Sequence, residues 1–567
     1  MSDIESKVSY RAVPDAPAEP LHDAQPVKRR AGSYAALVAA GIFLSRLAGL
    51  VRTRVMAHFL GSSRAADAFN AALKVPNFLQ NLFGEGVLSA SFIPVYARLL
   101  ARNDEKLAGR VAGVIATILA LITSALVLLG VLLTPFLIGI IAPGFEGDVR
   151  ALTIRIVRIL FPGVGLLVLS AWCLGVLNSH RKFFLSYVAP VLWNAAMIAT
   201  LVIFGTRLKE FPLAVALAWG TVAGCALQLG VQLPFVFRYA KHLSFGVERL
   251  EPVNEAIRNF GPVVVGRGVV QLSAYIDQMI ASYLPEGAVA SLSYAQIIYL
   301  LPISLFGMSV AAAELPQMSG ELGSEEEVHA ALRKRLARGL RQIAFFVIPT
   351  VVAFAAIGRV LVAALYETGK FTPDTTRYVW YILAGSTVGL LAATLGRLYS
   401  SAFYALGDTK SPLRYAAARV ALTGGLGYLF AFPLRPVIVA VITALHLPLP
   451  RVPGGEAALG AVGLTASAGV AGWVEYLLLR RGLQRRIGKM ESTGGFEARL
   501  WLAAVIAAAA AVAFDLLAAR RASNHLPLAR IVEAGLVAGL FGVVYFAAAF
   551  ALKIPEARAT LNRFVKR

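Results

Sequence analysis

The sequence predicts an all-α polytopic membrane protein with about fourteen transmembrane helices, and three observations support this class. Of the 567 residues, 58% are hydrophobic and only 15% are charged, and the mean hydropathy is +0.69. Apolar runs long enough to span a bilayer recur along the chain, and Lys and Arg gather in the loops between them. A soluble domain could not bury this much apolar surface.

The predicted helices follow these apolar runs in chain order. Each run is long enough to cross about 30 Å of hydrocarbon at about 1.5 Å per residue. The runs lie near 35–60, 68–98, 110–141, 151–177, 185–206, 212–237, 256–284, 288–318, 340–365, 376–406, 413–443, 457–479, 499–519 and 529–552.

The loop charges predict that both termini are cytoplasmic. Loops after alternate helices hold about 22 Lys and Arg residues, whereas the opposite loops hold about nine, and cytoplasmic loops carry the excess. Membrane orientation therefore explains the net charge of +22, and no nucleic-acid partner is expected. Cys173 and Cys225 lie inside apolar runs without metal-like spacing, so neither a disulfide framework nor a metal site is predicted.

Short sequence matches predict two lobes related by an internal repeat. Ala57-His-Phe-Leu recurs as Ala281-Ser-Tyr-Leu and Pro76 as Pro302. Matches this short also arise by chance, although their similar offsets favour a repeat. Two pseudo-symmetric six-helix lobes would face each other across a central cavity. The predicted parts are a disordered cytoplasmic tail (1–33), an N-lobe (34–238), a cytoplasmic linker (239–255), a C-lobe (256–480), a basic cytoplasmic loop (481–498), two C-terminal helices (499–552) and a basic tail (553–567).

Helix-breaking residues cluster in three of the predicted helices. Pro and Gly are common in bilayer helices, so these positions are either hinges or kinks without a function. They are Pro76, Gly84, Gly86 and Pro94 in the second helix, Gly261, Pro262, Gly266 and Gly268 in the seventh, and Pro302, Gly307 and Pro316 in the eighth.

Charged residues inside the apolar runs are the candidate site, because no soluble-enzyme motif occurs. An ionisable side chain at mid-bilayer costs at least about 2.5–3.5 kcal/mol, so it faces the protein interior or water. Arg46 and Arg52 would form a wall for a phosphate ligand. The alternative for each charge is an ion pair between helices or a charge that snorkels to the interface. The set is Arg46, Arg52, Arg54, Asp67, Lys74, Glu85, Arg267, Asp277, Glu314 and Arg397.

A family resemblance rests on SRLAGLVR, ADAF and LKVPNFLQNLFGEGVLSASFIP between Ser45 and Pro94. This stretch resembles the MurJ (MviN-like) lipid II flippases of the multidrug/oligosaccharidyl-lipid/polysaccharide exporter superfamily. The resemblance implies cavity or pyrophosphate contacts at Arg46, Arg52, Lys74 and Arg397, and gating or coupling roles at Asp67 and Glu85. The chain departs from the family pattern at Thr53, Gln80 and Ile297. Arg267 would replace the charge missing at Ile297, and Asp277 is a further coupling candidate.

The resemblance implies a transporter and not an enzyme. It would move lipid II, the undecaprenyl-pyrophosphate-linked peptidoglycan precursor, from the inner to the outer leaflet of the bacterial cytoplasmic membrane by alternating access. We expect a monomer without cofactors that contacts membrane lipids and the cell-wall synthesis machinery, with an energy source or coupling ion that the sequence does not identify. The alternatives are a flippase for another polysaccharide precursor, a cation-coupled drug exporter and a non-transporting scaffold.

Overall fold

The computed structural model describes residues 25–321, 323–489, 494–519 and 527–565. Within these ranges the chain forms helices joined by turns and contains no strand, which confirms the all-α class. The elements are α1 (Gln25–Leu60), α2 (Arg64–Phe83), α3 (Glu85–Ala101), α4 (Glu105–Ile141), α5 (Gly147–Ser179), α6 (Phe183–Phe204), α7 (Glu210–Tyr239), α8 (Glu251–Ser282), α9 (Ala288–Pro302), the π-helical η1 (Ile303–Met308), α10 (Ser309–Ser319), α11 (Glu325–Ala356), α12 (Gly358–Tyr366), α13 (Pro373–Ala405), α14 (Lys410–Ala431), α15 (Arg435–Ala444), the 3₁₀ turn η2 (Gly455–Leu459), α16 (Gly460–Ile487), α17 (Gly494–Ala519), α18 (Pro527–Ala551) and α19 (Pro555–Val565).

Many of these helices are suited to cross a membrane. In the described part of the chain, ten are long and apolar enough, and α14 with α15, bent by 63°, form one further candidate. The ten do not include α1, α2, α3 or α8. The multi-pass membrane class is therefore confirmed, and the count of about fourteen stays a prediction.

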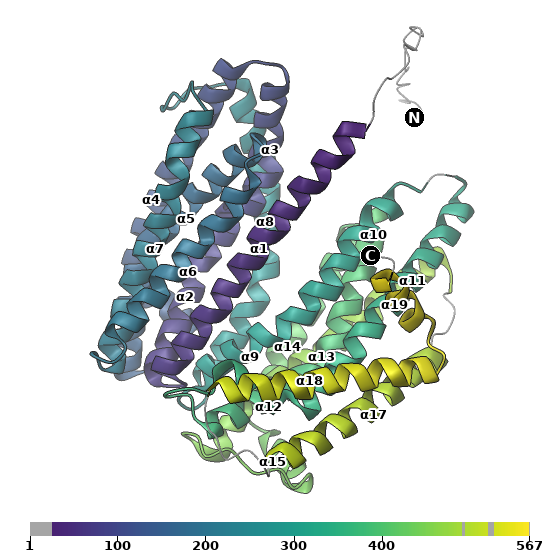
Figure 1. The fold of residues 1–567 in the computed structure, drawn as a ribbon. Coiled ribbons are helices and arrows are strands. Elements are labelled where there is room, and N and C mark those ends of the chain that lie inside the picture. The colour runs from purple at the N-terminus through teal and green to yellow at the C-terminus, as the bar shows by residue number, and fades with distance from the viewer. Residues whose placement is uncertain (1–24, 322, 490–493, 520–526, 566–567) are drawn as a thin grey trace, which may run out of the picture.

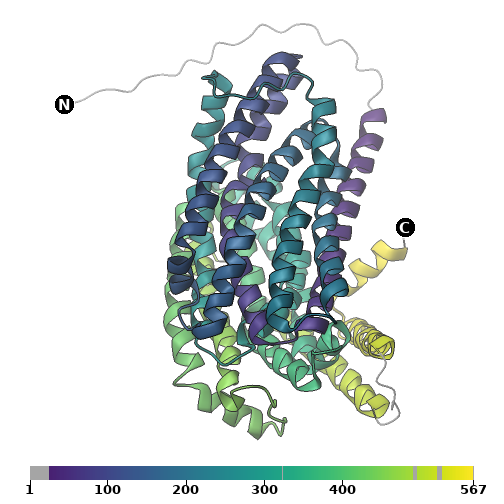
Figure 2. The same ribbon diagram turned by 90° about the vertical axis from the view of Figure 1, so that its left-hand side faces the viewer.

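The helices are arranged in two lobes (Figure 1). We call α1–α7 the N-lobe and α9–α16 the C-lobe, with α8 between them. The lobes meet at the end that holds the α1–α2 turn, called here the clasp end, and their ribbons diverge toward the opposite end, called the far end. Figure 2 shows the N-lobe helices running along the long axis of the molecule. The hairpin of α17 and α18 packs against α11 and α12.

Buried apolar side chains form two clusters that follow this arrangement. The larger one runs through the C-lobe and the clasp end of the N-lobe. The smaller one fills the far half of the N-lobe and includes Val253 and Ala256 at the start of α8. Among the side chains that the structure describes, the lobes therefore share an apolar core only at the clasp end.

The helix breaks agree with the predicted positions in two cases out of three. Gly84 separates α2 from α3, and the π-helical η1 follows Pro302. In contrast, α8 is one continuous helix through Gly261 and Pro262. A bilayer helix can accommodate such residues when its neighbours satisfy the backbone groups.

The first helix differs from the predicted boundary. It begins at Gln25, inside the segment 1–33 that the sequence analysis assigned to a disordered tail. Helix propagation is cooperative, and the Lys, Arg and Ala residues after Gln25 are good helix formers, so α1 extends past its apolar run. Residues 1–24 lie outside the described part of the chain.

The linker at 239–255 is fixed to the N-lobe. Gly109 on α4 lets the linker approach closely, since a Cβ there would lie 2.4 Å from the carbonyl oxygen of His242. Arg98 on α3 forms a 2.8 Å ion pair with Glu255 at the start of α8. The first turns of α8 therefore belong structurally to the N-lobe, whereas its last turns pack against α14 of the C-lobe.

Candidate functional site

Three arginines on α1 lie in different surroundings. Arg46 is exposed. The Arg52 guanidinium lies over the Trp193 ring of α6, 5.1 Å from its centre, an arrangement in which the aromatic face attracts the cation. Arg54 donates hydrogen bonds to the carbonyl oxygens of Ala364 and Leu365 at the end of α12. Arg54 therefore joins the lobes, while Arg46 and Arg52 lie about 9 Å apart along the helix axis at about 1.5 Å per residue.

Asp67 makes the central contact of the clasp end. Its side chain is only 5% exposed. One carboxylate oxygen accepts a hydrogen bond from the Gly287 N–H at 2.6 Å, and the other accepts one from the Ala290 N–H at 2.8 Å. These donors lie at the N-terminus of α9, where backbone N–H groups lack helical partners and the helix dipole favours a negative charge. A carboxylate on the N-lobe thus caps a helix of the C-lobe.

Neighbouring residues complete this contact, which we call the clasp (residues 61–67 with 286–294). The Ser62 and Ser291 hydroxyls lie 2.9 Å apart, and the buried Tyr294 hydroxyl donates to the Gly61 carbonyl oxygen at 2.9 Å. Gly287 has φ +87°, and a Cβ there would lie 2.5 Å from the carbonyl oxygen of Ser62. Only glycine fits this conformation and this spacing. The clasp thus holds the first turns of α2 and α9 together.

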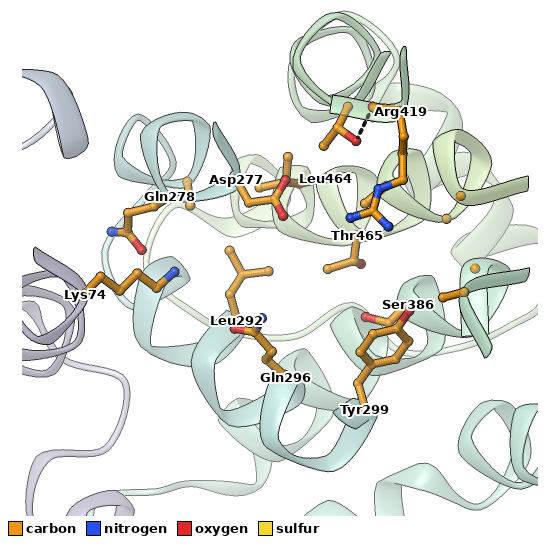
Figure 3. A pocket seen from close by; sticks show the side chains of 17 residues that line it. Lys74, Asp277, Gln278, Leu292, Gln296, Tyr299, Ser386, Arg419, Leu464 and Thr465 are labelled. Atoms are coloured by element: carbon orange, nitrogen blue, oxygen red, sulfur yellow. Dashed lines mark hydrogen bonds between the residues drawn. The ribbon is translucent and has the colours of Figure 1, made fainter. Parts of the chain in front are cut away.

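A polar cavity of about 270 Å³ lies in the C-lobe, where α8, α9, α13, α14 and α16 surround it. Lys74 of α2 reaches it from the N-lobe, so both lobes line it. In Figure 3 the Lys74 ammonium and the Arg419 guanidinium point into the cavity from opposite sides, with Asp277 between them. The volume is enough for several water molecules at about 30 Å³ each.

Asp277 is the carboxylate of this cavity. The charges that act on it are those of Lys74 and Arg419. Its Oδ1 atom is buried and accepts no hydrogen bond from the described residues, and the neighbouring Gln278 Nε2 also has no partner among them. Arg419 is shared, because it forms a 3.1 Å ion pair with Glu475 of α16. Polar atoms inside a bilayer-spanning protein without partners are a sign of bound water or of a functional group.

The wall of the cavity between α13 and α16 is closely packed. Gly389 and Gly469 meet there, and a Cβ at Gly389 would lie 2.4 Å from the Gly469 Cα. The Thr465 hydroxyl crosses to the Ile382 carbonyl oxygen at 3.0 Å. Small residues let these two helices approach closely, as in membrane helix pairs generally.

The structure brings together only some of the predicted site residues. Lys74 and Asp277 share the cavity, and Asp67 lies in the clasp. Arg397 is exposed on α13. It interacts electrostatically with Arg419 and Tyr299, which line the cavity. The side chains of Glu85 and Arg267 lie outside the described residues.

Two charged residues of the site were missed by sequence reasoning. Arg419 lies inside the predicted span 413–443 and Glu475 inside the predicted span 457–479. The criterion that selected Asp277, a charge within an apolar run, selects both of them. The signal was present in the sequence and was not applied to these two helices.

Sequence comparisons relate this chain to known proteins. The family model described as "Lipid II flippase MurJ" matches residues 56–447. A "Probable lipid II flippase MurJ" of Rhizobium meliloti (strain 1021) is 32% identical over 538 residues, covering 92% of this chain and 94% of the relative. A "Lipid II flippase MurJ" of Burkholderia cenocepacia is 30% identical over 517 residues, covering 89% and 94%.

Two solved structures have a similar fold. "Lipid II flippase MurJ, inward closed conformation" superposes with a TM-score of 0.69 at 22% identity and covers 91% of this chain and 99% of the other. An inward-facing multidrug resistance MATE family transporter of the MOP superfamily superposes with a TM-score of 0.58 at 19% identity, covering 78% and 94%. At these identities the two structures support the fold alone.

Proposed function

The chain belongs to the MurJ family, and from this membership we propose that it is a lipid II flippase of the bacterial cytoplasmic membrane. It carries the undecaprenyl-pyrophosphate-linked peptidoglycan precursor from the inner to the outer leaflet as a transporter and not as an enzyme. The observation that carries this proposal is the family match over residues 56–447, supported by relatives of 30–34% identity that carry this name. Lipid II and membrane lipids are then its partners.

The orientation belongs to the proposal as well. Loops at the far end are rich in Lys and Arg, including those around Arg102, Arg181, Lys241 and Arg485. By the positive-inside rule this end faces the cytoplasm, together with both termini. The clasp end then faces outward. The proposal also includes a monomer that delivers its substrate to the cell-wall synthesis machinery.

The described conformation corresponds to one state of an alternating-access cycle. The clasp joins the lobes at the outer end, and within the described side chains the apolar core shared by the lobes lies at that end alone. At the far end the described ion pairs of the N-lobe with later residues, Arg98–Glu255 and Arg110–Glu248, bind the linker and the start of α8. Rocking of the lobes about α8 would open the clasp and close the far end.

Arg46 and Arg52 are proposed to hold the pyrophosphate. A doubly charged group leaving water needs fixed opposite charge, and guanidinium groups provide it with paired hydrogen bonds. Arg46 is exposed, and the Arg52 guanidinium lies over the Trp193 ring. Arg267 and Arg397 are proposed as further contacts for the substrate. Lys74 lines the same cavity as Asp277 and is proposed as a further substrate contact.

Complementation of a flippase-depleted bacterium tests this function. Arg46→Ala and Arg52→Ala should each abolish growth at normal membrane abundance, because losing a charge-assisted hydrogen bond worth about 1.5–3 kcal/mol lowers affinity roughly tenfold or more. Arg52→Lys should restore growth only in part. Arg207→Ala, at an exposed position of the α6–α7 turn, is the matched control and should support growth. Wild-type precursor export by both alanine variants would refute the pyrophosphate site, and failure of the unmodified chain to export lipid II would refute the function.

A further inference from the structure

We propose that Arg155 and Arg158 on α5 form a binding site for the anionic headgroup of a phospholipid in the outer leaflet. Together with Trp219 of α7, the two arginines line a shallow recess of about 410 Å³ on the surface of the N-lobe. The recess shares no lining residue with the cavity around Asp277. Only its assignment to the outer leaflet rests on the proposed function, which directs the clasp end outward.

The recess lies toward the clasp end of α5. In the turn before this helix, the Gly144 N–H donates a hydrogen bond to the Ser282 hydroxyl at 3.0 Å, and Ser282 ends the helix that precedes the clasp residues 286–294. Arg155 and Arg158 lie about 12 and 17 Å from the start of α5 at about 1.5 Å per residue. Both arginines therefore belong to the outer half of this helix.

Both side chains are on the face of α5 that is turned away from the protein core. Arg155, Arg158 and Pro162 are exposed, whereas Ile156 and Leu160 are buried on the other side of the helix. Residues three positions apart are neighbours on a helix surface, about 5–6 Å between Cβ atoms. Helix side chains also tilt toward the N-terminus, so the two guanidinium groups lie side by side and point toward the outer end.

The two arginines mark the outer boundary of the hydrocarbon. The segment 159–177, which follows Arg158 directly, contains no Asp, Glu, Lys or Arg. Its length of about 29 Å matches a hydrocarbon core of about 30 Å. Trp219 supports this level, because it is 60% exposed and Trp residues gather where hydrocarbon meets headgroups. The recess therefore lies at the depth of the lipid headgroups.

The positive charge of the recess is not balanced by an acid. Among the described residues that line it, none is Asp or Glu. Arg150, nearer the start of α5, donates a hydrogen bond to the Pro135 carbonyl oxygen at 3.3 Å, whereas Arg155 and Arg158 have no such partner in the described part of the chain. A charge that faces lipid is costly. Snorkelling toward water would lower the cost for each arginine separately, but one headgroup phosphate neutralises both.

The chemistry of the recess selects an anionic phospholipid. Guanidinium groups bind phosphate through paired, charge-assisted hydrogen bonds, and the indole of Trp219 carries one further N–H donor. Two positive charges favour a headgroup with net negative charge, such as phosphatidylglycerol, over a choline headgroup, whose own cation would lie beside the arginines. Ile154 and Ile159 supply apolar lining for the first part of the acyl chain. A lipid bound there fixes the depth of the N-lobe in the outer leaflet.

Lipid nanodiscs that hold the full-length chain test this inference. The discs contain phosphatidylcholine and a rising fraction of phosphatidylglycerol, brominated near the headgroup end of its acyl chains, and the Trp219 signal is the fluorescence lost on Trp219→Phe. Quenching should saturate at a low fraction of phosphatidylglycerol. Arg155→Gln combined with Arg158→Gln should raise the fraction needed for half-maximal quenching roughly tenfold or more, because the charge-assisted hydrogen bonds are lost. Arg207→Gln, at an exposed position of the α6–α7 turn, is the matched control and should behave as the unmodified chain.

A second variant pair separates charge from side-chain size. Arg155→Lys combined with Arg158→Lys should retain part of the selectivity, since Lys keeps the charge without the paired geometry. Equal quenching by brominated phosphatidylcholine, an unchanged half-maximal fraction in the glutamine pair, or displacement of the lipid by inorganic phosphate would overturn the site. The assay measures binding without transport. A chain that binds phosphatidylglycerol but exports no lipid II would therefore refute the proposed function alone, and one that exports lipid II without this selectivity would refute the headgroup site alone.

Discussion

Two carboxylates, Asp67 in the clasp and Asp277 in the cavity, have partners of different kinds. Both oxygens of Asp67 accept hydrogen bonds from backbone N–H groups at a helix N-terminus. Asp277 instead faces the charged side chains of Lys74 and Arg419, and its Oδ1 atom accepts no hydrogen bond from the described residues. Backbone donors have one fixed arrangement, so they define a single closed state. Side-chain cations on two lobes change position with the lobes, so the environment of Asp277 depends on conformation.

The largest expected effect comes from Asp67→Ala, which removes the carboxylate that accepts the backbone hydrogen bonds of Gly287 and Ala290. Hydrogen bonds to a charged acceptor are worth about 1.5–3 kcal/mol each, so losing two should favour the open clasp by about 3 kcal/mol, or roughly a hundredfold. The measurement is the maleimide labelling rate of Ser291→Cys, with both native cysteines buried. The control is Asp374→Asn, and an unchanged labelling rate in Asp67→Ala would contradict the latch role.

Gly389→Ala tests whether the close packing of α13 against α16 fixes the cavity wall beside Asp277. The new Cβ would lie 2.4 Å from the Gly469 Cα, so α13 and α16 must separate, at a cost of about 1–3 kcal/mol. We expect a lower thermal unfolding midpoint in detergent. Gly425→Ala on α14, where a Cβ meets nothing within 4 Å, is the control and should not lower the midpoint. Equal midpoints for the two variants would show that α13 and α16 can separate at little cost, so that the close approach of Gly389 and Gly469 does not hold the cavity wall in place.

Tyr294→Phe measures how much the contacts around Asp67 contribute to the stability of the clasp. The variant removes the hydrogen bond to the Gly61 carbonyl oxygen and should destabilise the closed clasp by about 0.5–1.5 kcal/mol. The labelling rate of Ser291→Cys should rise, but the increase should be several-fold smaller than the increase caused by Asp67→Ala. A rise equal to that of Asp67→Ala would show that the clasp acts as one unit without a dominant residue.

The smallest effect is expected at Asp408, a third carboxylate that lies in the α13–α14 turn outside the membrane-spanning segments. Hydrogen bonds from Ser411 and Lys410 and the charge of Arg486 hold the pKa of Asp408 below its usual value of 3.8. A lowered pKa in the folded state stabilises the protein above the unfolded pKa, and this contribution is lost as the pH falls through the folded value.

Asp408→Asn should therefore lower the unfolding midpoint slightly at pH 7, on the order of 1 °C. The difference from the unmodified chain should begin to shrink as the pH falls below about 4 and should disappear below the pKa of the folded state. Differential scanning fluorimetry across this pH range measures it. A difference that is constant with pH would mean that the side-chain shape at Asp408, and not its charge, stabilises the turn.

The sequence alone determined the properties that depend on neighbouring residues. Apolar runs and charge-rich loops predicted the all-α membrane class, because hydrophobic length and loop charge act locally on insertion. The positions of Gly84 and Pro302 predicted helix breaks for the same reason, since these residues limit their own backbone. The same local criterion selected Lys74, Asp67 and Asp277 as candidates.

Only the tertiary structure decided which of these residues meet. The sequence assigned Asp67 and Asp277 to one group of gating or coupling residues, yet the fold gives one of them backbone donors and the other two side-chain cations. Likewise, Arg419 joins Asp277 because α14 packs against α8 and α16. Pairings between helices far apart in the chain depend on close approaches such as Gly389 against Gly469, and no local pattern of hydrophobicity or charge encodes those approaches.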